Sequence, residues 1–504
     1  MYIGDYMARR GIYTPDKIAI VDAAATPAKR YSYTVLNRRA NQLAQWLREK
    51  GVLPGDRVAM LAHDGIYFYD AFFACSKLGA IFVPLNWRLH GREIADQLVL
   101  TTPKLLLYRR EQPMAAVLEH LRSCADMPEL IGWEEEVVFS KIALRVTCES
   151  VRESDTACLL FTGGTTGKPK AAQISHGQLV WNTFNSLLAD VLGTDTFLNL
   201  FPMFHAGGLF AFSIPLLILG GTVVQTKKFE AAQVLDLVEK ENATILAGVP
   251  TIFQMLAAAP NWVTANLHSL RYCMSGGAPM PVPLMQKYQR EKGVVFRQGF
   301  GMTEFGPGVF SLASADAERK AGAIGMPNFF VDARIVNQES NQPLPAGEIG
   351  ELVLRGPSAM TGYFVDPQAT AAAFDSENYF HTGDLAYQDE EGYFFIVDRL
   401  KDMFISGGEN VYPAEIEAAL YRHPAVALCA VIGVKEEKWG EVGRAFVVRK
   451  PEIKTDEATL LEHLRGQLAA YKVPKAIIFL ESLPVSGAGK ILKAELRQRL
   501  EPGA

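Results

Sequence analysis

The sequence predicts an α/β fold with a large N-terminal domain built from several subdomains, and a small α+β domain at the C-terminus. Three observations lead to this expectation. The chain has 504 residues, which is too many for a single hydrophobic core. Before Asp332, short apolar runs alternate with amphipathic stretches, the pattern of largely parallel sheets covered by helices. After Asp332, shorter strands with turn residues between them predict a β-rich subdomain.

The elements of the N-terminal domain follow from these runs in chain order. Helices are expected at the amphipathic stretches 30–50 and 178–189. In such folds, active sites gather where strands end. Strands are expected at 57–61, 81–84, 105–108, 157–161, 197–201, 222–225, 244–247 and 294–296.

The β-rich subdomain is expected to contain strands at 333–336, 351–355 and 393–397. A more compact pattern follows Asp398, and a small α+β domain of about a hundred residues fits it. The expected division is a domain 1–398, a linker 399–401 and a domain 402–504. The C-terminal elements are a helix from Pro413, strands at 426–434, 445–449 and 476–480, and a helix at 456–469.

Composition narrows the class of protein. Hydrophobic residues make up 49% and charged residues 21% of the chain, the mix of an ordinary globular protein. The net charge of -5 gives no general attraction to nucleic acid or to an anionic membrane. The six cysteines are far apart and predict reduced, mostly buried thiols. Without a signal-like N-terminus or an apolar run of about 18 residues, a cytoplasmic protein with no transmembrane segment is expected.

A glycine-rich loop carries the first chemical signal. The stretch Phe161-Thr-Gly-Gly-Thr-Thr-Gly-Lys-Pro-Lys170 follows a strand-like run and precedes a helix expected to begin at Ser175, with Gln178 placed for a capping box. Its glycines, hydroxyls and lysines favour phosphate binding. The Walker register does not fit, because Pro169 stands where that motif has Ser or Thr. Taken alone, the loop is also compatible with a Gly/Thr surface turn.

The loop resembles the signature of the adenylate-forming superfamily, which includes acyl-CoA and aryl-CoA synthetases, luciferases and the adenylation domains of peptide synthetases. Departures are few: Gly163 stands where the family often has Ser, Ala171 where it has Gly, and Ala488 where it has Thr. Further blocks appear in the family's order: Pro202-Met-Phe-His-Ala-Gly-Gly208, Ser275-Gly-Gly-Ala-Pro279, Gln298-Gly-Phe-Gly-Met-Thr-Glu304, Tyr379-Phe-His-Thr-Gly-Asp384, Asp398-Arg-Leu-Lys-Asp402, Ser406-Gly-Gly-Glu-Asn410 and Gly487-Ala-Gly-Lys490.

The resemblance implies a ligase that uses ATP, Mg²⁺ and coenzyme A. A carboxylate and ATP would form acyl-AMP and pyrophosphate, and acyl transfer to the CoA thiol would then release AMP. Among the roles implied, Asp384 binds the ribose hydroxyls, Glu304 binds Mg²⁺, Thr303 binds the α-phosphate and Phe300 stacks on adenine. The alternatives are a loop carboxylate for Asp384, an exposed glutamate for Glu304 and ordinary core packing for Phe300. The resemblance assigns ATP or AMP binding to Thr162, Gly163, Gly164, Thr165, Thr166, Gly167, Lys168, Lys170, Gly277, Ala278, Pro279, Gln298, Gly299, Phe300, Gly301, Met302, Asp384, Ile396 and Arg399.

The C-terminal blocks imply catalysis and movement. Lys490 would stabilise the charge that builds on the transferring phosphoryl group. Lys401 matches the hinge about which a small mobile domain rotates between the two half-reactions. A solvated lysine and a charged linker are the alternatives. CoA is expected at Gly407, Gly408, Trp439, Lys472 and Lys475.

The acyl site is expected beside His205, which would separate the acyl pocket from the CoA channel; a core histidine is the alternative. The expected pocket residues are apolar or small, without an acidic group for an α-amine, so an apolar tail is favoured over an amino acid. Hydrophobic walls discriminate weakly between tails. The motif spellings are closest to bacterial fatty-acid–CoA ligases, which favours a medium- or long-chain fatty acid and leaves aryl or cyclic acids open. The pocket residues are Phe204, Ala206, Gly207, Gly248, Val249 and Gly276.

Other functions remain open at this point. The acyl group could pass to a carrier protein, the adenylate could be oxidised to emit light, or the chain could be a non-catalytic binding homologue. Retention of Glu304, Asp384 and Lys490 argues against the last. The expected partners are a carboxylic acid, ATP and CoA, with no nucleic acid, transient membrane contact at most, and a monomeric or homodimeric chain.

Overall fold

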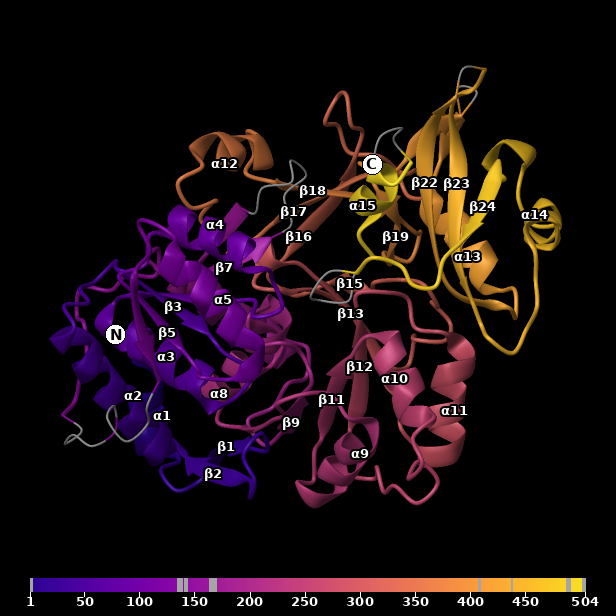
Figure 1. Ribbon diagram of the computed structural model, residues 1–504. Coiled ribbons are helices and arrows are strands. Elements are labelled where there is room, and N and C mark those ends of the chain that lie inside the picture. The colour runs from indigo at the N-terminus through magenta and orange to yellow at the C-terminus, as the bar shows by residue number, and fades with distance from the viewer. Residues whose placement is uncertain are drawn as a thin grey trace. The chain divides into compact units, whose positions relative to one another are not determined.

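The computed structural model describes residues 3–133, 139, 144–162, 170–406, 409–436, 438–485 and 491–500. The chain divides into two compact units, one comprising residues 1–332 and 354–380 and the other comprising residues 333–353 and 381–504. Both units combine helices and sheets (Figure 1). The mixed α/β architecture predicted from the sequence is therefore confirmed.

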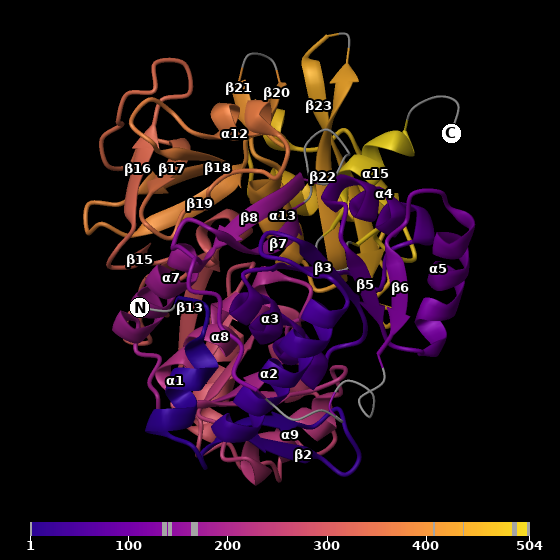
Figure 2. The ribbon, with the colours of Figure 1, turned by 90° about the vertical axis from the view of Figure 1, so that its left-hand side faces the viewer.

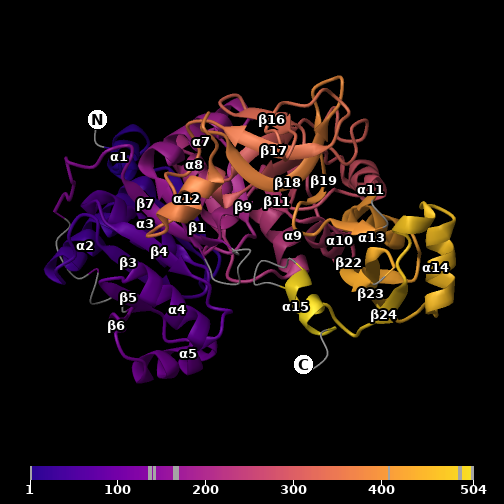
Figure 3. The ribbon, with the colours of Figure 1, turned by 90° about the horizontal axis from the view of Figure 1, so that it is seen from above.

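A six-stranded sheet forms one part of the first unit, in the order β6-β5-β3-β4-β7-β8. Its strands pair in parallel except at the β7–β8 edge. Helices α4 and α5 pack on one face through an apolar cluster that includes Leu61, Val83 and Leu98 and are visible outside the strands in Figure 3. The elements are β3 (Arg57–Leu61), α3 (Ile66–Leu78), β4 (Ile81–Leu85), α4 (Gly91–Thr101), β5 (Leu105–Tyr108), α5 (Gln112–Ser123), β6 (Glu129–Gly132), β7 (Thr156–Thr162) and β8 (Lys170–Ser175).

A nine-stranded sheet forms the other part of this unit, in the order β15-β14-β13-β12-β11-β9-β10-β1-β2. The strands from β13 to β1 are parallel, and antiparallel strands close both edges. Its strands are β1 (Ile18–Asp22), β2 (Lys29–Ser32), β9 (Thr196–Asn199), β10 (Thr222–Gln225), β11 (Ile245–Gly248), β12 (Tyr272–Gly276), β13 (Phe296–Gly301), β14 (Gly308–Leu312) and β15 (Met326–Pro327).

Helices cover this second sheet. Phe253 and Tyr288 belong to the apolar core that α9, α10 and α11 form against β11–β13, and Figure 1 shows these helices on one side of the strands. The helical segments of the unit are α1 (Tyr6–Tyr13), α2 (Tyr33–Glu49), α7 (His176–Leu188), a π-helical turn (Gly207–Ala211), α8 (Ser213–Leu219), α9 (Ala231–Lys240), α10 (Pro250–Ala257), α11 (Val282–Lys292), a 3₁₀ turn (Thr303–Phe305) and α12 (Pro367–Ala373).

The second unit contains the sheet β16-β17-β18-β19 and a five-stranded sheet formed by β20–β24; Figure 2 shows β16–β19 side by side. Alternation along β22 separates two cores, because Cys429 and Val431 face α13 and α14, whereas Ala430 and Ile432 face α15. The elements are β16 (Asp332–Val336), β17 (Gly350–Arg355), β18 (Phe380–Gln388), β19 (Phe394–Arg399), β20 (Phe404–Ser406), β21 (Glu409–Val411), α13 (Pro413–Tyr421), β22 (Val426–Glu436), β23 (Gly440–Arg449), α14 (Glu457–Arg465), a 3₁₀ turn (Ala470–Lys472), β24 (Ala476–Phe479) and α15 (Lys493–Gln498).

Several expected elements differ from the structure at their ends. The stretch 30–50 is a helix only from Tyr33, because Lys29–Ser32 forms strand β2 against β1 and the Ser32 hydroxyl caps α2. Strand β13 begins at Phe296, later than 294. Helix α14 ends at Arg465, before the expected 469. Strands β16–β19 belong largely to the compact unit that contains the C-terminal residues, whereas the sequence division placed them in the N-terminal domain. The division near 398–402 stays a prediction.

Two further expectations concern the cysteines and membranes. All six cysteines are free, and four of them, including Cys75 and Cys273, are buried, as the sequence predicted. Within the part of the chain that the structure describes, no helix has the length and apolarity needed to cross a bilayer.

Candidate nucleotide and acyl site

Many of the predicted site residues lie where β11, β12 and β13 end. Gly276 and Gly299 are register partners on adjacent strands, and Gly248 of β11 pairs with Ser275. Parallel strands bring these carboxyl ends to one edge of the sheet. A Cβ atom at Gly301 would lie 2.0 Å from the carbonyl oxygen of Pro307, so only glycine fits there. The glycines therefore let a ligand approach the backbone closely at this edge.

The loop after β12 adds the residues predicted to line adenine. Gly277 has a φ of +79°, and Gly277, Ala278 and Pro279 are exposed. The loop is fixed by Gln298, whose Oε1 accepts a hydrogen bond of 2.9 Å from the amide of Met280. The Nε2 atom of the same side chain is buried without a partner in the described structure. A buried donor at the edge of an exposed loop favours a ligand there.

Phe300 was predicted to stack on adenine. Its ring contacts Phe310 edge-on, with centroids 5.9 Å apart, and it remains partly exposed. The ring therefore packs on the sheet and also presents surface to a ligand. Its role stays a prediction.

Glu304 lies in the 3₁₀ turn Thr303–Phe305 that follows β13, and it is 9% exposed. The Glu304 carbonyl accepts hydrogen bonds from the amide of Met360 at 2.7 Å and from the Gln178 side chain at 3.4 Å. Its carboxylate oxygen Oε1 accepts from the Tyr363 hydroxyl at 3.3 Å. Backbone and side chain are thus both fixed, as a preorganised metal ligand requires.

Tyr363 also contacts the residue that ends the predicted phosphate loop. Thr162 and Lys170 are register partners at the ends of β7 and β8, the strands which that loop connects. The Lys170 ammonium lies 4.9 Å from the centroid of the Tyr363 ring. Burial, followed by the nearby charge of Glu304, raises the pKa of Tyr363, so its hydroxyl stays protonated and donates. Sequence reasoning missed this residue.

The region after the phosphate loop differs in part from the prediction. Strand β8 separates the loop from helix α7. The Ser175 hydroxyl caps that helix by accepting from the amide of Gln178, as predicted. The reciprocal half of the capping box is absent from the described contacts: the Gln178 side chain instead reaches the carbonyl of Glu304. The helix start therefore also supports the Glu304 turn.

Buried polar side chains hold the segment that carries His205. The carboxylate of Asp64, which follows β3, accepts a hydrogen bond of 2.8 Å from the amide of Met203, and Asn199 at the end of β9 accepts from Phe201 at 3.0 Å. Asn199 also donates to the carbonyl of Gly208 at 3.1 Å. Both sheets therefore anchor one loop. Asp64 and Asn199 were not among the predicted site residues, because neither lies in a recognised motif.

Within this loop, Phe204 and Ala206 are buried, whereas His205 and Gly207 are partly exposed. The Nδ1 atom of His205 accepts from the amide of Gly207 at 3.2 Å, which leaves the proton of a neutral ring on Nε2. Val249, at the end of β11, is partly exposed. The structure thus places the expected acyl-pocket residues on one loop and on neighbouring strand ends; their role stays a prediction.

Asp64 has an unusual electrostatic environment. Burial raises its pKa to about 7, although the hydrogen bond from Met203 and the positive charge of Arg88 both oppose this shift. Arg88 also lies over the ring of Phe204, with 5.6 Å between the guanidinium carbon and the ring centroid. A carboxyl group that titrates near neutral pH thus lies directly behind the His205 loop.

In the second unit, the predicted ribose ligand and the predicted phosphate-region arginine are neighbours. Asp384 on β18 is the register partner of Arg399 on β19, and their Oδ1 and Nε atoms are 2.5 Å apart. The Asp384 side chain is 3% exposed, whereas that of Arg399 is 49% exposed. Ile396, also on β19, pairs with Ala386. Sequence spacing alone did not predict this contact.

The expected hinge, Lys401, is exposed between two anchored carboxylates. Asp398 accepts a hydrogen bond of 2.7 Å from the amide of Ala414, and Asp402 forms an ion pair of 2.9 Å with Arg497 of α15. Rotation about Lys401 stays a prediction.

Among the residues expected to bind CoA, Trp439 and Lys475 lie near each other. The ammonium of Lys475 is 5.9 Å from the Trp439 ring, and the Trp439 side chain is exposed. Lys472 instead forms an ion pair of 2.7 Å with Glu415, so its charge is already compensated. Nine expected site residues lie outside the described part of the chain: Gly163, Gly164, Thr165, Thr166, Gly167, Lys168, Gly407, Gly408 and Lys490.

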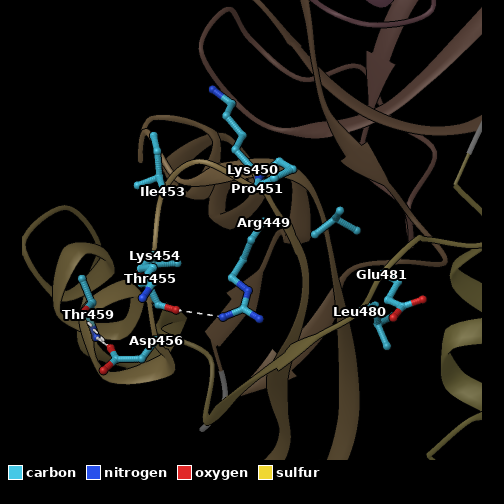
Figure 4. Close-up of a pocket in the computed structure, with 11 residues that line it drawn as sticks. Arg449, Lys450, Pro451, Ile453, Lys454, Thr455, Asp456, Thr459, Leu480 and Glu481 are labelled. Atoms are coloured by element: carbon cyan, nitrogen blue, oxygen red, sulfur yellow. Dashed lines mark hydrogen bonds between the residues drawn. The ribbon is translucent and has the colours of Figure 1, made fainter.

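Glu304 fits the predicted Mg²⁺ site, because Mg²⁺ is commonly bound by one or two carboxylates together with substrate phosphates. No group of three or more metal-binding side chains occurs among the described residues, and a site completed by phosphates needs none. A depression of about 770 Å³ in the second unit is lined by residues such as Arg449, Lys454 and Thr455 (Figure 4). It includes none of the predicted site residues.

Comparison with known proteins gives the family. The AMP-binding enzyme family matches residues 8–364, and the AMP-binding enzyme C-terminal domain matches residues 415–490. Feruloyl-CoA synthase of an Amycolatopsis species is 42% identical over 99% of both chains. Indoleacetate–CoA ligase of Aromatoleum aromaticum is 37% identical over 99% of this chain and 98% of its own.

Solved structures agree with these relatives. An o-succinylbenzoate–CoA synthetase of Bacillus subtilis, in complex with ATP and magnesium ion, is similar with a TM-score of 0.87 and 30% identity over 98% of this chain and 99% of its own. A Mycobacterium tuberculosis fatty acyl-CoA synthetase has a TM-score of 0.80 and 34% identity over 99% and 98%. The resemblance in the sequence motifs is thereby confirmed: the chain belongs to the AMP-binding enzyme family and is an AMP-forming acid–CoA ligase.

Proposed function

We propose that the chain joins an aromatic carboxylic acid to coenzyme A through an aryl-acyl adenylate. The observation that carries the aromatic part is the agreement of two relatives over nearly the whole chain, since both are named for acids with a planar ring. The paired glycines Gly276 and Gly299 are compatible with this substrate, because backbone without side chains lets a flat ring approach closely.

In the adenylation step, the carboxylate of the acid attacks the α-phosphorus of ATP, and pyrophosphate leaves. The acid is already ionised at pH 7, given a reference pKa near 4, so the step needs no base. Lys170 and Lys490 would bring positive charge to the phosphates, and Thr303 would donate to the α-phosphate. Asp384 would accept from the ribose hydroxyls. Positioning and electrostatic stabilisation therefore supply most of the catalysis.

Mg²⁺, when bound, would neutralise charge on the phosphates, and Glu304 is the described carboxylate suited to hold it. In the second step, the CoA thiolate attacks the acyl carbon, and AMP leaves. His205 and Gly207 would border the path of the thiol, while Gly407 and Gly408 would leave room for the pantetheine arm. The exposed pair Trp439 and Lys475 would meet the nucleotide end of CoA.

The test is CoA-dependent AMP release with a panel of acids: ferulate, indoleacetate, a medium-chain fatty acid and an amino acid. The expected result is a kcat/KM for at least one aromatic acid that exceeds that of the fatty acid by tenfold or more. A preference for the fatty acid would overturn the aromatic assignment and support the alternative favoured by the motif spellings, which the Mycobacterium tuberculosis structure also represents. Absence of ATP–pyrophosphate exchange with every acid of the panel would overturn the enzyme assignment.

The identity of the acyl acceptor distinguishes a CoA ligase from an enzyme that transfers the acyl group to a carrier protein. AMP release that depends on free CoA, with acyl-CoA as the product, supports the ligase. Adenylate formation without CoA-dependent turnover would instead support a carrier-protein acceptor. The cytoplasmic location and the oligomeric state stay predictions of the sequence.

A further inference from the structure

Tyr363 lies between two charged side chains that the adenylation step would use. Its hydroxyl donates to Oε1 of Glu304 at 3.3 Å, and its ring lies 4.9 Å from the ammonium of Lys170. The two charged residues come from different elements, the 3₁₀ turn after β13 and the start of β8. One aromatic side chain therefore contacts both.

The backbone around Tyr363 is fixed, so its ring has a defined place. The amide of Tyr363 donates to the Thr370 hydroxyl at 2.9 Å, and the amide of Phe364 donates to the carbonyl of Ala171 at 2.8 Å. Tyr363 also forms an isolated antiparallel bridge with Ala172 of β8. The segment is thus attached to the strand that carries Lys170.

Each contact of Tyr363 restricts the movement of one charged side chain, Glu304 or Lys170. A tyrosine hydroxyl on one carboxylate oxygen restricts rotation of the Glu304 side chain. A cation over an aromatic ring is attracted by the negative face of that ring, so the Tyr363 ring restrains the Lys170 ammonium.

We infer that Tyr363 is a positioning residue for adenylation: its hydroxyl orients the Glu304 carboxylate for Mg²⁺, and its ring orients the Lys170 ammonium for the ATP phosphates. The inference rests on the proposed function of the same site. It assigns separate tasks to two parts of one side chain. These tasks can be removed one at a time.

The test uses the full chain and the variants Tyr363→Phe and Tyr363→Leu. Binding of a non-hydrolysable ATP analogue is measured by titration calorimetry with and without Mg²⁺. Tyr363→Phe keeps the ring and loses the hydroxyl, so the gain in affinity that Mg²⁺ produces should fall roughly tenfold, the effect of one hydrogen bond to a charged group. Affinity without Mg²⁺ should be unchanged. Tyr363→Leu should in addition weaken binding without Mg²⁺ by about threefold, through loss of the cation–π contact.

A matched control removes another tyrosine–carboxylate hydrogen bond in the same unit. The buried Tyr379 hydroxyl donates to Asp332, and Tyr379→Phe should leave the Mg²⁺ response unchanged. Acyl transfer from supplied acyl-adenylate to CoA uses neither ATP nor Mg²⁺, so it should proceed in Tyr363→Phe at the wild-type rate.

The outcomes are distinguishable. An unchanged Mg²⁺ response in Tyr363→Phe, or an equal loss in both half-reactions, overturns the positioning role while the ligase assignment stands. A wild-type chain that neither binds the ATP analogue nor exchanges pyrophosphate with any acid overturns the proposed function itself. A Mg²⁺ response lost in Tyr363→Phe and kept in Tyr379→Phe supports the inference.

Discussion

Asp64→Asn tests whether the buried carboxyl group behind the His205 loop destabilises the fold at high pH. Asparagine keeps an oxygen that can accept the 2.8 Å hydrogen bond from the amide of Met203, and it cannot ionise. The substitution therefore removes the charge while leaving the local geometry nearly unchanged. Any difference between variant and wild type that depends on pH then reports on the Asp64 carboxyl group.

The size of the effect follows from the pKa. Burial raises the pKa of Asp64 from 3.8 to about 7, a difference of about three units at about 1.36 kcal/mol each. The protonated folded form is favoured, so the stabilisation is fully present below pH 3.8 and is lost as the pH rises through 7. Relative to wild type, Asp64→Asn should thus be roughly 3 kcal/mol more stable at pH 8 than at pH 5.

Urea unfolding followed by tryptophan fluorescence measures this difference. Five of the six tryptophans lie in the first unit and Trp439 lies in the second, so a Trp439→Phe background reports on the first unit alone. Asp96→Asn on α4, an exposed carboxylate, serves as the matched control and should change by less than about 0.5 kcal/mol between the two pH values. Equal stability differences for Asp64→Asn at pH 5 and pH 8 would refute the assignment of a raised pKa.

Three further substitutions test the site and its scaffold. Lys490→Ala should abolish acyl-adenylate formation and spare thioester formation from supplied adenylate; an equal loss of both steps in stopped assays would contradict that division. Gly208→Ala should lower the free energy of unfolding in the urea assay by roughly 2–4 kcal/mol, because the new Cβ would lie 2.2 Å from the carbonyl oxygen of Pro202. Gly207→Ala is the control, since the nearest atom to its new Cβ would be 3.5 Å away. Comparable losses for the two variants would show that this crowding is not decisive. Asp70→Ala should cost roughly 3–5 kcal/mol, because it leaves the largely buried guanidinium of Arg39 without its ion-pair partner, and a cost below about 1 kcal/mol would contradict that reasoning.

Much of the fold was readable from local pattern. Strands β3, β5 and β10 have the predicted bounds, because each is a short apolar run with helix-forming sequence on both sides. Strand β2 was missed, because Lys29–Ser32 becomes a strand only by pairing with β1. Its residues carry no apolar alternation of their own. Pairing partners far away in the chain are invisible to local periodicity.

The candidate site likewise contains residues that the sequence predicts and residues that only the structure reveals. Motif residues such as Glu304 and Asp384 were predicted from the sequence, because each lies in a short block with a fixed order of residue types. Tyr363 lies 59 residues from Glu304, and Asp64 lies 139 residues from Met203. No short block contains either pair. These contacts exist because separate strands and loops pack together.

Residue types at short spacing are enough to predict the α/β class, the order of the motifs and the family chemistry of adenylation. The packed structure selects the side chains that support that chemistry. It placed Tyr363 against both Glu304 and Lys170, and it buried Asp64 so that its pKa moves to about 7. Both effects need segments that are far apart in the sequence to pack together, because packing creates the contacts of Tyr363 and removes Asp64 from water.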